Sequence, residues 1–355
     1  LESGALQEQL DWWREELSPL SEPLDLPTDR PRPPVPSAQG HIVRDELPRP
    51  LYAAVRLRSR REGVSLYHTA LSAFTVLLSR RTGRTDWMIG WGMANRRLKE
   101  IEPMIGMVVN TVVLRCRTEG DPSFSALLQR NRRMLIGAHE HQDLPFERLV
   151  EGLQPERQAA RNPLFSIMFS FHDSPVPDFV LPGLEGELLE RHNGSAKMDL
   201  NVVVKPQAEQ RIAQGAEAEG DMTIVWEYTT DLFDHATIER LWRQYKSLLA
   251  AAVDDPSRRV SELPLLTPEE RQQLLRLSAG TALPTGELLP ARLARVVARY
   301  PERPALVAAD GEEVSYARLA RAAAALAERL AALGGRAARI AARLLSRPPR
   351  RPVAA

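Results

Sequence analysis

The sequence predicts an α/β fold, in which helices pack against a mixed sheet, because strand and helix patterns alternate along it. Residues 165–171 form a continuous apolar run, which is typical of a strand covered on both faces. Residues 222–228 place large apolar side chains at every second position, as a strand does. Residues 238–249 repeat apolar side chains at helical spacing behind Asp234, a residue type that often caps helices.

The earlier part of the chain continues this alternation. Proline fixes φ and removes an amide donor, so the proline-rich residues 18–37 predict an extended connector. Asp121 followed by Pro122 predicts a helix start, because the carboxylate can cap free amides and proline at the first helical position loses no bond. The other expected elements are a helix in residues 1–17, a helix over 65–81 that stops at Gly83, and strands over 86–92 and 111–117, the last with Cys116 in the core.

Composition indicates a globular protein without a strongly charged partner. Apolar residues make up 43% and charged residues 26%, near the averages of globular chains. The 47 Lys and Arg residues balance 46 Asp and Glu residues, so no net field favours nucleic acid or an anionic membrane. With one cysteine and no apolar run of about 20 residues, we expect a cytoplasmic protein.

A change of composition near residue 254 predicts a domain boundary. The segment that follows is rich in charge and proline, as linkers between domains often are. Beyond it we expect a helix over 288–299, a strand pair around Asp310 and Gly311, and a helix capped by Ser315. The expected division is residues 1–253, a linker at 254–285, a second piece at 286–335, and an unstructured Arg/Ala-rich tail at 336–355.

The densest polar cluster, His139, Glu140, His141 and Asp143, raises the question of a metal site. Zinc ligands on one helix face need a spacing of three or four residues, whereas His139 and His141 are two apart. We therefore assign no metal. We interpret the cluster as a helix end and turn, in which Asp143 caps a following helix that is entered through Pro145.

Three further windows follow one another along the chain: DWMIGWGMANRRLKEIEPMIGMVVNTVVLR, HQDLPFERLVEGLQPER and RNPLFSIMFSF. In this order and spacing they resemble the late core motifs of nonribosomal peptide synthetase condensation domains. The resemblance covers residues 1–253, as the C-terminal part of such a domain. Within the expected linker, LPLLTPEER resembles the usual linker to an adenylation domain, and VSYARLARAAAALAERLAALG resembles the first core motif of that domain, whose start is thereby expected at 286–335.

The resemblance implies a chloramphenicol acetyltransferase-like fold of two αβ lobes with a tunnel between them, and this chain supplies one lobe. In the family, donor and acceptor arrive as thioesters on the phosphopantetheine arms of carrier domains, and no cofactor is bound directly. The implied partners are peptidyl and aminoacyl carrier domains, the missing N-terminal lobe and a downstream adenylation domain. The family's catalytic His-His-x-x-x-Asp-Gly motif does not occur here, so we assign no catalytic residue and expect the isolated chain to be inactive.

Several positions match the family's other motifs and are expected to shape the tunnel or the contact between lobes. Gly106 and Asn110 can hold a turn near a substrate arm, because glycine tolerates positive φ and asparagine bonds locally; alternatively, they only terminate a strand. The matching positions are Asn95, Arg96, Gly106, Asn110, Thr111, His141, Gln142, Asp143, Arg161, Pro163 and Asp199.

Two other functions stay open at this point. One is a non-catalytic lobe that docks carrier domains. The other is a free-standing acyltransferase that uses coenzyme A thioesters, which would need a histidine–aspartate site within the chain. We also expect the chain to be a fragment that begins further upstream, and the arginine-rich tail suggests a shifted reading frame or a broken gene end.

Overall fold

The computed structural model divides the chain into two compact units, Leu1–Gln272 and Gln273–Ala355. Asn95 and Arg96, two of the expected site residues, lie outside the described residues, as does the expected tail at 336–355. Among the helices that are described, none is both long and apolar enough to cross a membrane. The structure describes residues 3–94, 100, 104–106, 108–155, 161–172, 180–181, 184–185, 191–206, 222–278, 289–308 and 311–332.

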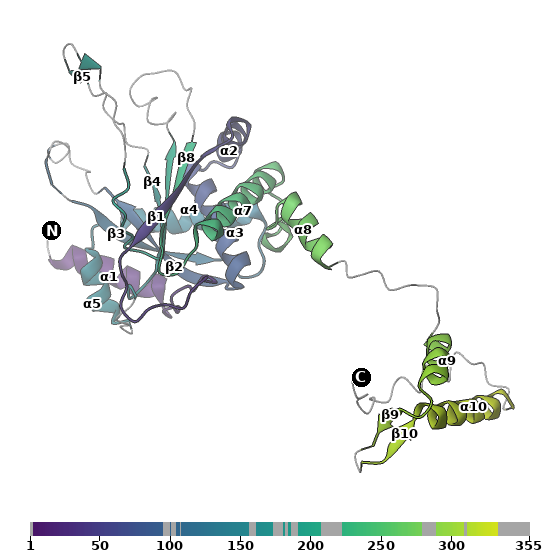
Figure 1. Ribbon diagram of the computed structural model, residues 1–355. Helices are drawn as coiled ribbons and strands as arrows, with labels where there is room; N and C mark the ends of the chain where they lie inside the picture. The colour runs from purple at the N-terminus through teal and green to yellow at the C-terminus, as the bar shows by residue number, and fades with distance from the viewer. Residues whose placement is uncertain are drawn as a thin grey trace. The chain divides into compact units, whose positions relative to one another are not determined.

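A mixed six-stranded sheet forms the centre of the first unit (Figure 1). In spatial order its strands are β1 (Gly40–Leu47), β8 (Met222–Thr229), β7 (Leu200–Pro206), β4 (Ile167–Phe171), β2 (Asp86–Met93) and β3 (Asn110–Arg117). β2, β4 and β7 run parallel, whereas the other neighbouring pairs are antiparallel. The predicted α/β class with a mixed sheet is therefore confirmed. A separate short pair joins β5 (Val180–Leu181) to β6 (Leu184–Glu185).

The parallel strands define two ends of this sheet. β2 ends at Met93 and β4 at Phe171, and we call this the carboxyl end. β4 begins at Ile167 and β7 at Leu200, and we call this the amino end. Since β3 runs against β2 and pairs Asn110 with Met93, β3 begins at the carboxyl end.

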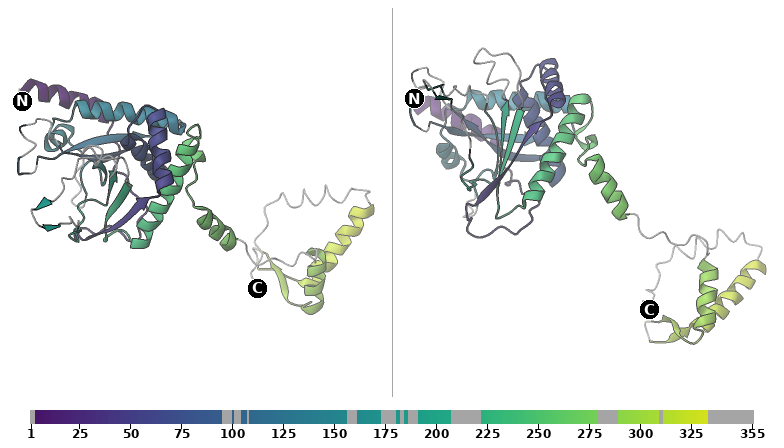
Figure 2. Two further views of the ribbon diagram at one scale, coloured as in Figure 1. Left: turned by 90° about the horizontal axis from the view of Figure 1, so that it is seen from above. Right: turned by 45° about the horizontal axis from the view of Figure 1, so that its top comes forward.

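Helices pack against one face of the sheet and along the margin at β3. Figure 2 shows α2, α4 and α7 together on one side of the strands. α3 contacts both α4 and α7, while α1 contacts α5, which contacts β3. The described helical elements of this unit are α1 (Ser3–Leu17), α2 (Arg49–Arg61), α3 (Leu66–Thr82), α4 (Phe124–Glu140), α5 (Phe146–Leu153), α7 (His235–Asp254) and the 3₁₀ turn η2 (Val260–Glu262). The helix α8 (Pro268–Ser278) spans the boundary between the two units at Gln272.

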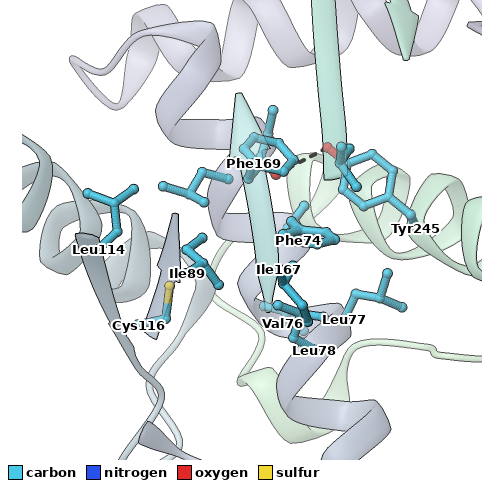
Figure 3. Packing of buried hydrophobic residues seen from close by; sticks show 14 of the residues in the cluster. Phe74, Val76, Leu77, Leu78, Ile89, Leu114, Cys116, Ile167, Phe169 and Tyr245 are labelled. Carbon is cyan, nitrogen blue, oxygen red and sulfur yellow. Dashed lines mark hydrogen bonds between the residues drawn. The ribbon is translucent and has the colours of Figure 1, made fainter. Parts of the chain in front are cut away.

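Aromatic side chains join the central helix α3 to the sheet. The ring centroid of Phe74 lies 4.9 Å from that of Phe169 in β4 and 5.8 Å from that of Trp226 in β8. Tyr245 of α7 donates its hydroxyl to the carbonyl of Ala70 at 3.1 Å, so that a second helix is fixed to α3 (Figure 3). Such aromatic pairs add about 0.5–1.5 kcal/mol each beyond the area that they bury.

Most elements predicted from apolar periodicity are confirmed. α3 begins after Ser65, whose side chain caps it, and ends at Gly83 with a φ of 73°. β2, β3, β8 and α7 lie where the patterns predicted them, and Cys116 is fully buried. The predicted covering of both faces of residues 165–171 is incomplete, because Met168 and Phe171 are only half-buried.

Two predicted helix caps differ from the structure. Ser123 rather than Asp121 caps α4, since its Oγ accepts from the Ala126 amide at 3.2 Å. Asp121 instead accepts from the amide and the hydroxyl of Ser261, at 2.9 and 2.7 Å, a partner that no local pattern reveals. Asp234 occupies the N-cap of α7 as predicted, but its side chain makes no capping hydrogen bond.

The sequence patterns did not predict β1 and α2. β1 is an edge strand in which only Val43 and Leu47 are buried, so its apolar signal is weak. The first part of the expected linker also packs on this unit, because Val260 and Leu263 are only 4% and 1% exposed. The compact unit accordingly extends beyond residue 253, to Gln272.

In the described part of the second unit, the elements after α8 are α9 (Leu289–Arg299), β9 (Pro304–Val307), β10 (Glu313–Ser315) and α10 (Tyr316–Ala332). β9 and β10 form the predicted antiparallel pair, of which Asp310 lies outside the described residues. The Oγ of Ser315 accepts from the Arg318 amide at 3.3 Å, which confirms Ser315 as a helix cap.

Candidate functional site

The structure separates the expected site residues into two groups at opposite ends of the sheet. Asn110 and Thr111 begin β3 at the carboxyl end, where the turn at residues 141–143 also lies. Arg161 and Pro163 precede β4, and Asp199 precedes β7, at the amino end. The nine positions that the structure describes therefore do not form one site.

Asn110 joins the start of β3 to the turn between α4 and α5. Its Nδ2 donates to the carbonyls of Gln142 and Leu144 at 2.8 and 2.9 Å. Its Oδ1 accepts from the amides of Thr111 and Phe146 at 2.9 and 3.2 Å. One half-buried side chain thus satisfies four backbone groups, two of them carbonyls of the α4–α5 connection.

The same contact corrects the capping prediction for Asp143. α5 has Pro145 at its N-cap and no capping bond from that residue. The free amide of Phe146 is satisfied by Asn110 instead, whereas the Asp143 carboxylate lies 3.5 Å from Nε2 of Gln9. The first free amide of α5 is therefore bound by Asn110, a residue distant in sequence, because the α4–α5 turn packs against β3.

His141 and Gln142 face back onto the end of α4. The Nδ1 of His141 lies 2.8 Å from the Gly137 carbonyl, and since a carbonyl only accepts, Nδ1 carries the proton. Gln142 is buried, and its Nε2 donates to the His139 carbonyl at 2.6 Å. The structure thus confirms the predicted helix end and turn at this cluster.

Three side chains of α1 complete this site, and the sequence patterns did not identify them. Trp13 donates its Nε1–H to the His141 carbonyl at 2.9 Å. Gln9 accepts from the Leu144 amide at 2.9 Å. The ring of Trp12 stacks on the ring of His141, with 4.0 Å between centroids and 4° between planes.

Gly106 lies in the segment before Asn110. Its φ is +156°, which side chains rarely adopt, and the space around its Cβ position is open. This agrees with the expectation that a glycine is needed there for its conformation rather than for close packing.

At the amino end, Arg161 and Asp199 bind the proline-rich connector. Arg161 pairs with Asp25 at 2.8 Å. Arg32 donates to both carboxylate oxygens of Asp199, through Nη1 at 2.9 Å and through Nη2, and these bonds raise the pKa of Arg32. A cavity of about 200 Å³ beneath the connector is lined by Arg32, Pro33, Arg161, Asn162, Lys197 and Asp199, among others.

Pro163 lines a separate cavity under the first half of the connector. This cavity has a volume of about 440 Å³, and Arg161 lines it as well. Leu24, within the same connector, is 2% exposed, and its carbonyl accepts from Ser166 Oγ at 3.3 Å. The amino-end group therefore fastens the connector to the sheet.

A further pocket, of about 620 Å³, opens where β2 and β4 end, and the sequence patterns do not point to it. Trp91 and Tyr67 form an aromatic wall, with 5.2 Å between their ring centroids. Arg56, Arg60 and His68 also line it, and burial, followed by the charge of Arg132, lowers the pKa of His68.

The pocket therefore combines an apolar wall with positive charge from arginines and a histidine that is neutral at physiological pH. Among the described residues, no group of three or more His, Cys, Asp or Glu side chains is placed to hold a metal ion.

Comparison with known families agrees with this fold. A family model described as "Condensation domain" matches residues 1–275. The chain belongs to the condensation domain family. Its curated relatives place it among the condensation domains of nonribosomal peptide synthetases.

Two relatives illustrate the extent of this similarity. Chondramide synthase cmdD of Chondromyces crocatus is 38% identical over 314 residues, which cover 88% of this chain and 8% of the relative. The dimodular nonribosomal peptide synthase of Bacillus subtilis (strain 168) is 37% identical over 313 residues, which cover 88% of this chain and 13% of the relative. The chain thus spans only a small part of either protein.

A solved structure supports the fold independently of these sequences. The X-domain from teicoplanin biosynthesis superposes with a TM-score of 0.68 at 26% sequence identity. The match covers 75% of this chain and 58% of that domain. The observed α/β architecture is therefore that of condensation-type domains.

Proposed function

We propose that residues 1–253 act as the C-terminal lobe of an amide-forming condensation domain within a larger nonribosomal peptide synthetase. The substrates are an acyl donor and an aminoacyl acceptor, each held as a thioester on the phosphopantetheine arm of a carrier domain. The acceptor amine attacks the donor carbonyl, a C–N bond forms, and the donor C–S bond breaks to leave a thiol on the donor arm. The proton of the attacking amine passes to a base.

The observation that carries this proposal is the side-chain amide of Asn110, which bonds the start of β3 to the turn at residues 141–143. These two segments belong to separate windows of the resemblance to condensation domains. Positioning of two thioester-bound groups supplies much of the rate of such a reaction, and positioning needs a rigid wall. We infer that Gly106, Asn110, Thr111 and the turn form that wall, and that Asn95 and Arg96 belong to it.

The pocket at the end of β2 and β4 supports a role with a phosphate-bearing arm. Arg56 and Arg60 offer donors that suit a phosphate, and Trp91 and Tyr67 offer an apolar surface for the rest of the arm. Ligands of α/β sheets commonly bind outside the carboxyl ends of parallel strands. The group at the amino end holds the connector, and its expected place along the tunnel or at the contact between lobes stays a prediction.

The catalytic base is supplied from outside these 355 residues. The sequence contains no His-His pair, which the family's catalytic motif requires. We therefore propose that the chain by itself does not form amide bonds, and that an N-terminal lobe provides the histidine. The isolated chain would then act as a non-catalytic lobe that docks carrier domains.

Residues 286–335 constitute, in this proposal, the start of an adenylation domain. The helix α9, the strand pair β9–β10 and the helix α10 follow the order of elements expected from that resemblance. The partners are then carrier domains, the N-terminal lobe and the rest of the adenylation domain, all acting in the cytoplasm.

The test supplies the missing lobe in trans. The chain is mixed with an N-terminal lobe that carries the His-His-x-x-x-Asp-Gly motif and with two carrier domains loaded with aminoacyl groups, and dipeptidyl carrier is quantified by intact mass spectrometry. We expect product only when both lobes are present.

Two controls make the result specific. Replacing the second histidine of the supplied lobe by alanine should abolish product, which distinguishes catalysis from spontaneous aminolysis. Product formed by the chain alone would contradict the proposal, as would failure of the two lobes to form product when the carriers are shown to be loaded.

A further inference from the structure

Side chains from distant elements bind backbone groups of the turn at residues 141–143. Asn110 of β3 binds the carbonyls of Gln142 and Leu144. α1 provides two further bonds, from Trp13 to the His141 carbonyl and from the Leu144 amide to Gln9. The turn is thus held between β3 on one side and α1 on the other.

Trp12 fixes the imidazole of His141 as well as the backbone. Its ring lies parallel to the imidazole at 4.0 Å, a separation at which stacked rings are in van der Waals contact. The Nδ1–H of His141 is fixed by the Gly137 carbonyl, so in the neutral ring Nε2 remains as a hydrogen-bond acceptor. Stacking and this bond together determine both the plane and the tautomer of the ring.

Two glycines indicate how closely α1 approaches. A Cβ at Gly137 would lie 2.6 Å from the ring of Trp12, and a Cβ at Gly152 would lie 2.5 Å from Leu10. Contacts below about 3 Å cannot persist, so each glycine makes room for one side chain of α1. The fit of α1 against α4 and α5 therefore depends on named pairs of residues.

We propose that Gln9 and Trp12 of α1 are positioning residues for the turn that carries His141, Gln142 and Asp143. The inference rests on the proposed function, because it assumes that this turn is part of the wall along which the thioesters meet. Trp13 is 3% exposed and Leu17 is fully buried, so both contribute to the core, and Trp13 in addition donates to the His141 carbonyl. Trp12 and Gln9 are less buried, and their contacts are with the turn itself.

The first test measures the ring of His141 directly in the 355-residue chain. Trp12→Leu removes the stacked ring, while Trp12→Phe keeps a flat aromatic surface. At a pH of about 9, where histidine is ordinarily neutral, ¹⁵N-correlated NMR spectra report the tautomer and the ring-current shift of His141. We expect Trp12→Leu to lose the ring-current shift and to mix the tautomers, and Trp12→Phe to retain a single tautomer.

The second test asks whether position matters for the reaction. In the two-lobe assay, we expect Trp12→Leu and Gln9→Ala to lower the rate of amide formation by about tenfold, since small displacements of a positioning group have large effects on rate. Trp12→Phe should stay within about threefold of the natural chain. Asp86→Asn, which weakens an ion pair at the opposite end of β2, serves as a control for general loss of stability.

A second-site variant keeps the proposal testable if Trp12→Leu unfolds. Gly137→Ala favours the helix by about 1 kcal/mol but forces a methyl group against Trp12, so it should lower the rate without lowering helix content. Combining Gly137→Ala with Trp12→Phe removes the clash and should restore the rate.

Three outcomes overturn the proposal. The first is an unchanged His141 spectrum in Trp12→Leu, and the second is a loss of rate in Asp86→Asn that equals the loss in Trp12→Leu at the same loss of thermal stability. The third is no rescue of the rate in the double variant. Absence of product with the natural chain would instead refute the proposed function. The NMR spectra would still show whether Trp12 orients the ring of His141.

Discussion

Arg115 in β3 binds Asp86 in β2 through two nitrogens, with Nε–Oδ1 and Nη2–Oδ2 distances of 2.9 and 2.6 Å. Its Nη1 also donates to the carbonyls of Glu16 and Ser18 at 3.2 and 2.9 Å, where α1 ends and the connector begins. The Arg115 side chain is 5% exposed and that of Asp86 is 23% exposed. One guanidinium therefore joins two strands to the entry of the connector.

Replacing Asp86 by Asn should destabilise the first unit by about 2 kcal/mol, because a buried guanidinium loses its charged acceptor. Urea denaturation followed by tryptophan fluorescence measures this difference. Glu151→Gln is the matched control, since Glu151 pairs with Arg148 where both side chains are more than 60% exposed, and exposed pairs contribute at most about 1 kcal/mol. Equal effects of the two variants would show that burial of the Asp86 pair is not important.

Gly90 and Gly92 provide a test of packing within one strand. A Cβ at Gly90 would lie 2.4 Å from the ring of Phe165, whereas a Cβ at Gly92 would meet its nearest neighbour, Ser170 Oγ, at 3.5 Å. We expect Gly90→Ala to cost about 1–3 kcal/mol through overpacking, and Gly92→Ala to be nearly neutral. Thermal unfolding of the two variants measures the contrast, and similar melting temperatures would contradict it.

The spacing of apolar residues predicted most helices and strands, because a helix or strand that buries one face shows a regular spacing within its own sequence. α3 shows this clearly, since Ser65, the apolar stripe and Gly83 specify its start, its face and its end. β1 escaped prediction because an edge strand buries only two of its side chains, Val43 and Leu47. Periodicity has little to detect in such a strand.

Partners of polar side chains were not predictable, because they come from distant segments. The resemblance to condensation domains selected residues 110 and 141–143 as motif positions, but nothing local indicated that Asn110 would bind the turn 32 residues later. Asp121, the predicted cap of α4, instead binds Ser261, while Ser123 two residues on takes the cap. A short polar side chain can accept hydrogen bonds from many donors, and tertiary packing determines which donor lies within reach.

Asn110→Asp should weaken the site specifically. A carboxylate cannot donate to the carbonyls of Gln142 and Leu144, and it would bring negative charge to them. We expect a loss of about 2–3 kcal/mol, the cost of leaving buried acceptors unsatisfied, and no amide formation in the two-lobe assay. Hydrogen exchange at the Phe146 amide should accelerate, because the bond from that amide to residue 110 depends on the turn staying in place.

Glu151→Gln serves as the control for Asn110→Asp, since it alters an exposed carboxylate of α5 that pairs with Arg148 and is not part of the proposed wall. It should leave both exchange and activity unchanged. If Asn110→Asp exchanged at the rate of this control, the turn would be held by other contacts and the proposed wall would need revision.

Cys116 should be unreactive in the folded chain. It is fully buried, and burial raises the pKa of its thiol to about 12, so that almost no thiolate forms at a pH of about 8. We expect iodoacetamide to label it only after unfolding in urea. Labelling of the native chain at the rate of an unfolded control would mean that β3 opens readily, although Cys116 is fully buried in the structure.

The contact between Asp121 and Ser261 should be lost in acid. The two hydrogen bonds from Ser261 lower the pKa of Asp121 below its ordinary value. A lowered pKa in the folded state means that the stabilisation is present above the unfolded pKa of about 3.9 and disappears as the pH falls through the folded value. Titration of the Asp121 carboxyl carbon by NMR measures that midpoint.

Ser261→Ala should move the Asp121 midpoint upward, toward the ordinary value, while Ser123→Ala, which removes the neighbouring cap of α4, should not. The same contact fastens the segment after α7 to the start of α4, so residues 256–263 should become sensitive to an acid-active protease such as pepsin only below the midpoint. A midpoint that is unchanged in Ser261→Ala would mean that the amide of residue 261 and the nearby arginines, Arg259 and Arg80, rather than the Ser261 hydroxyl, set the pKa of Asp121.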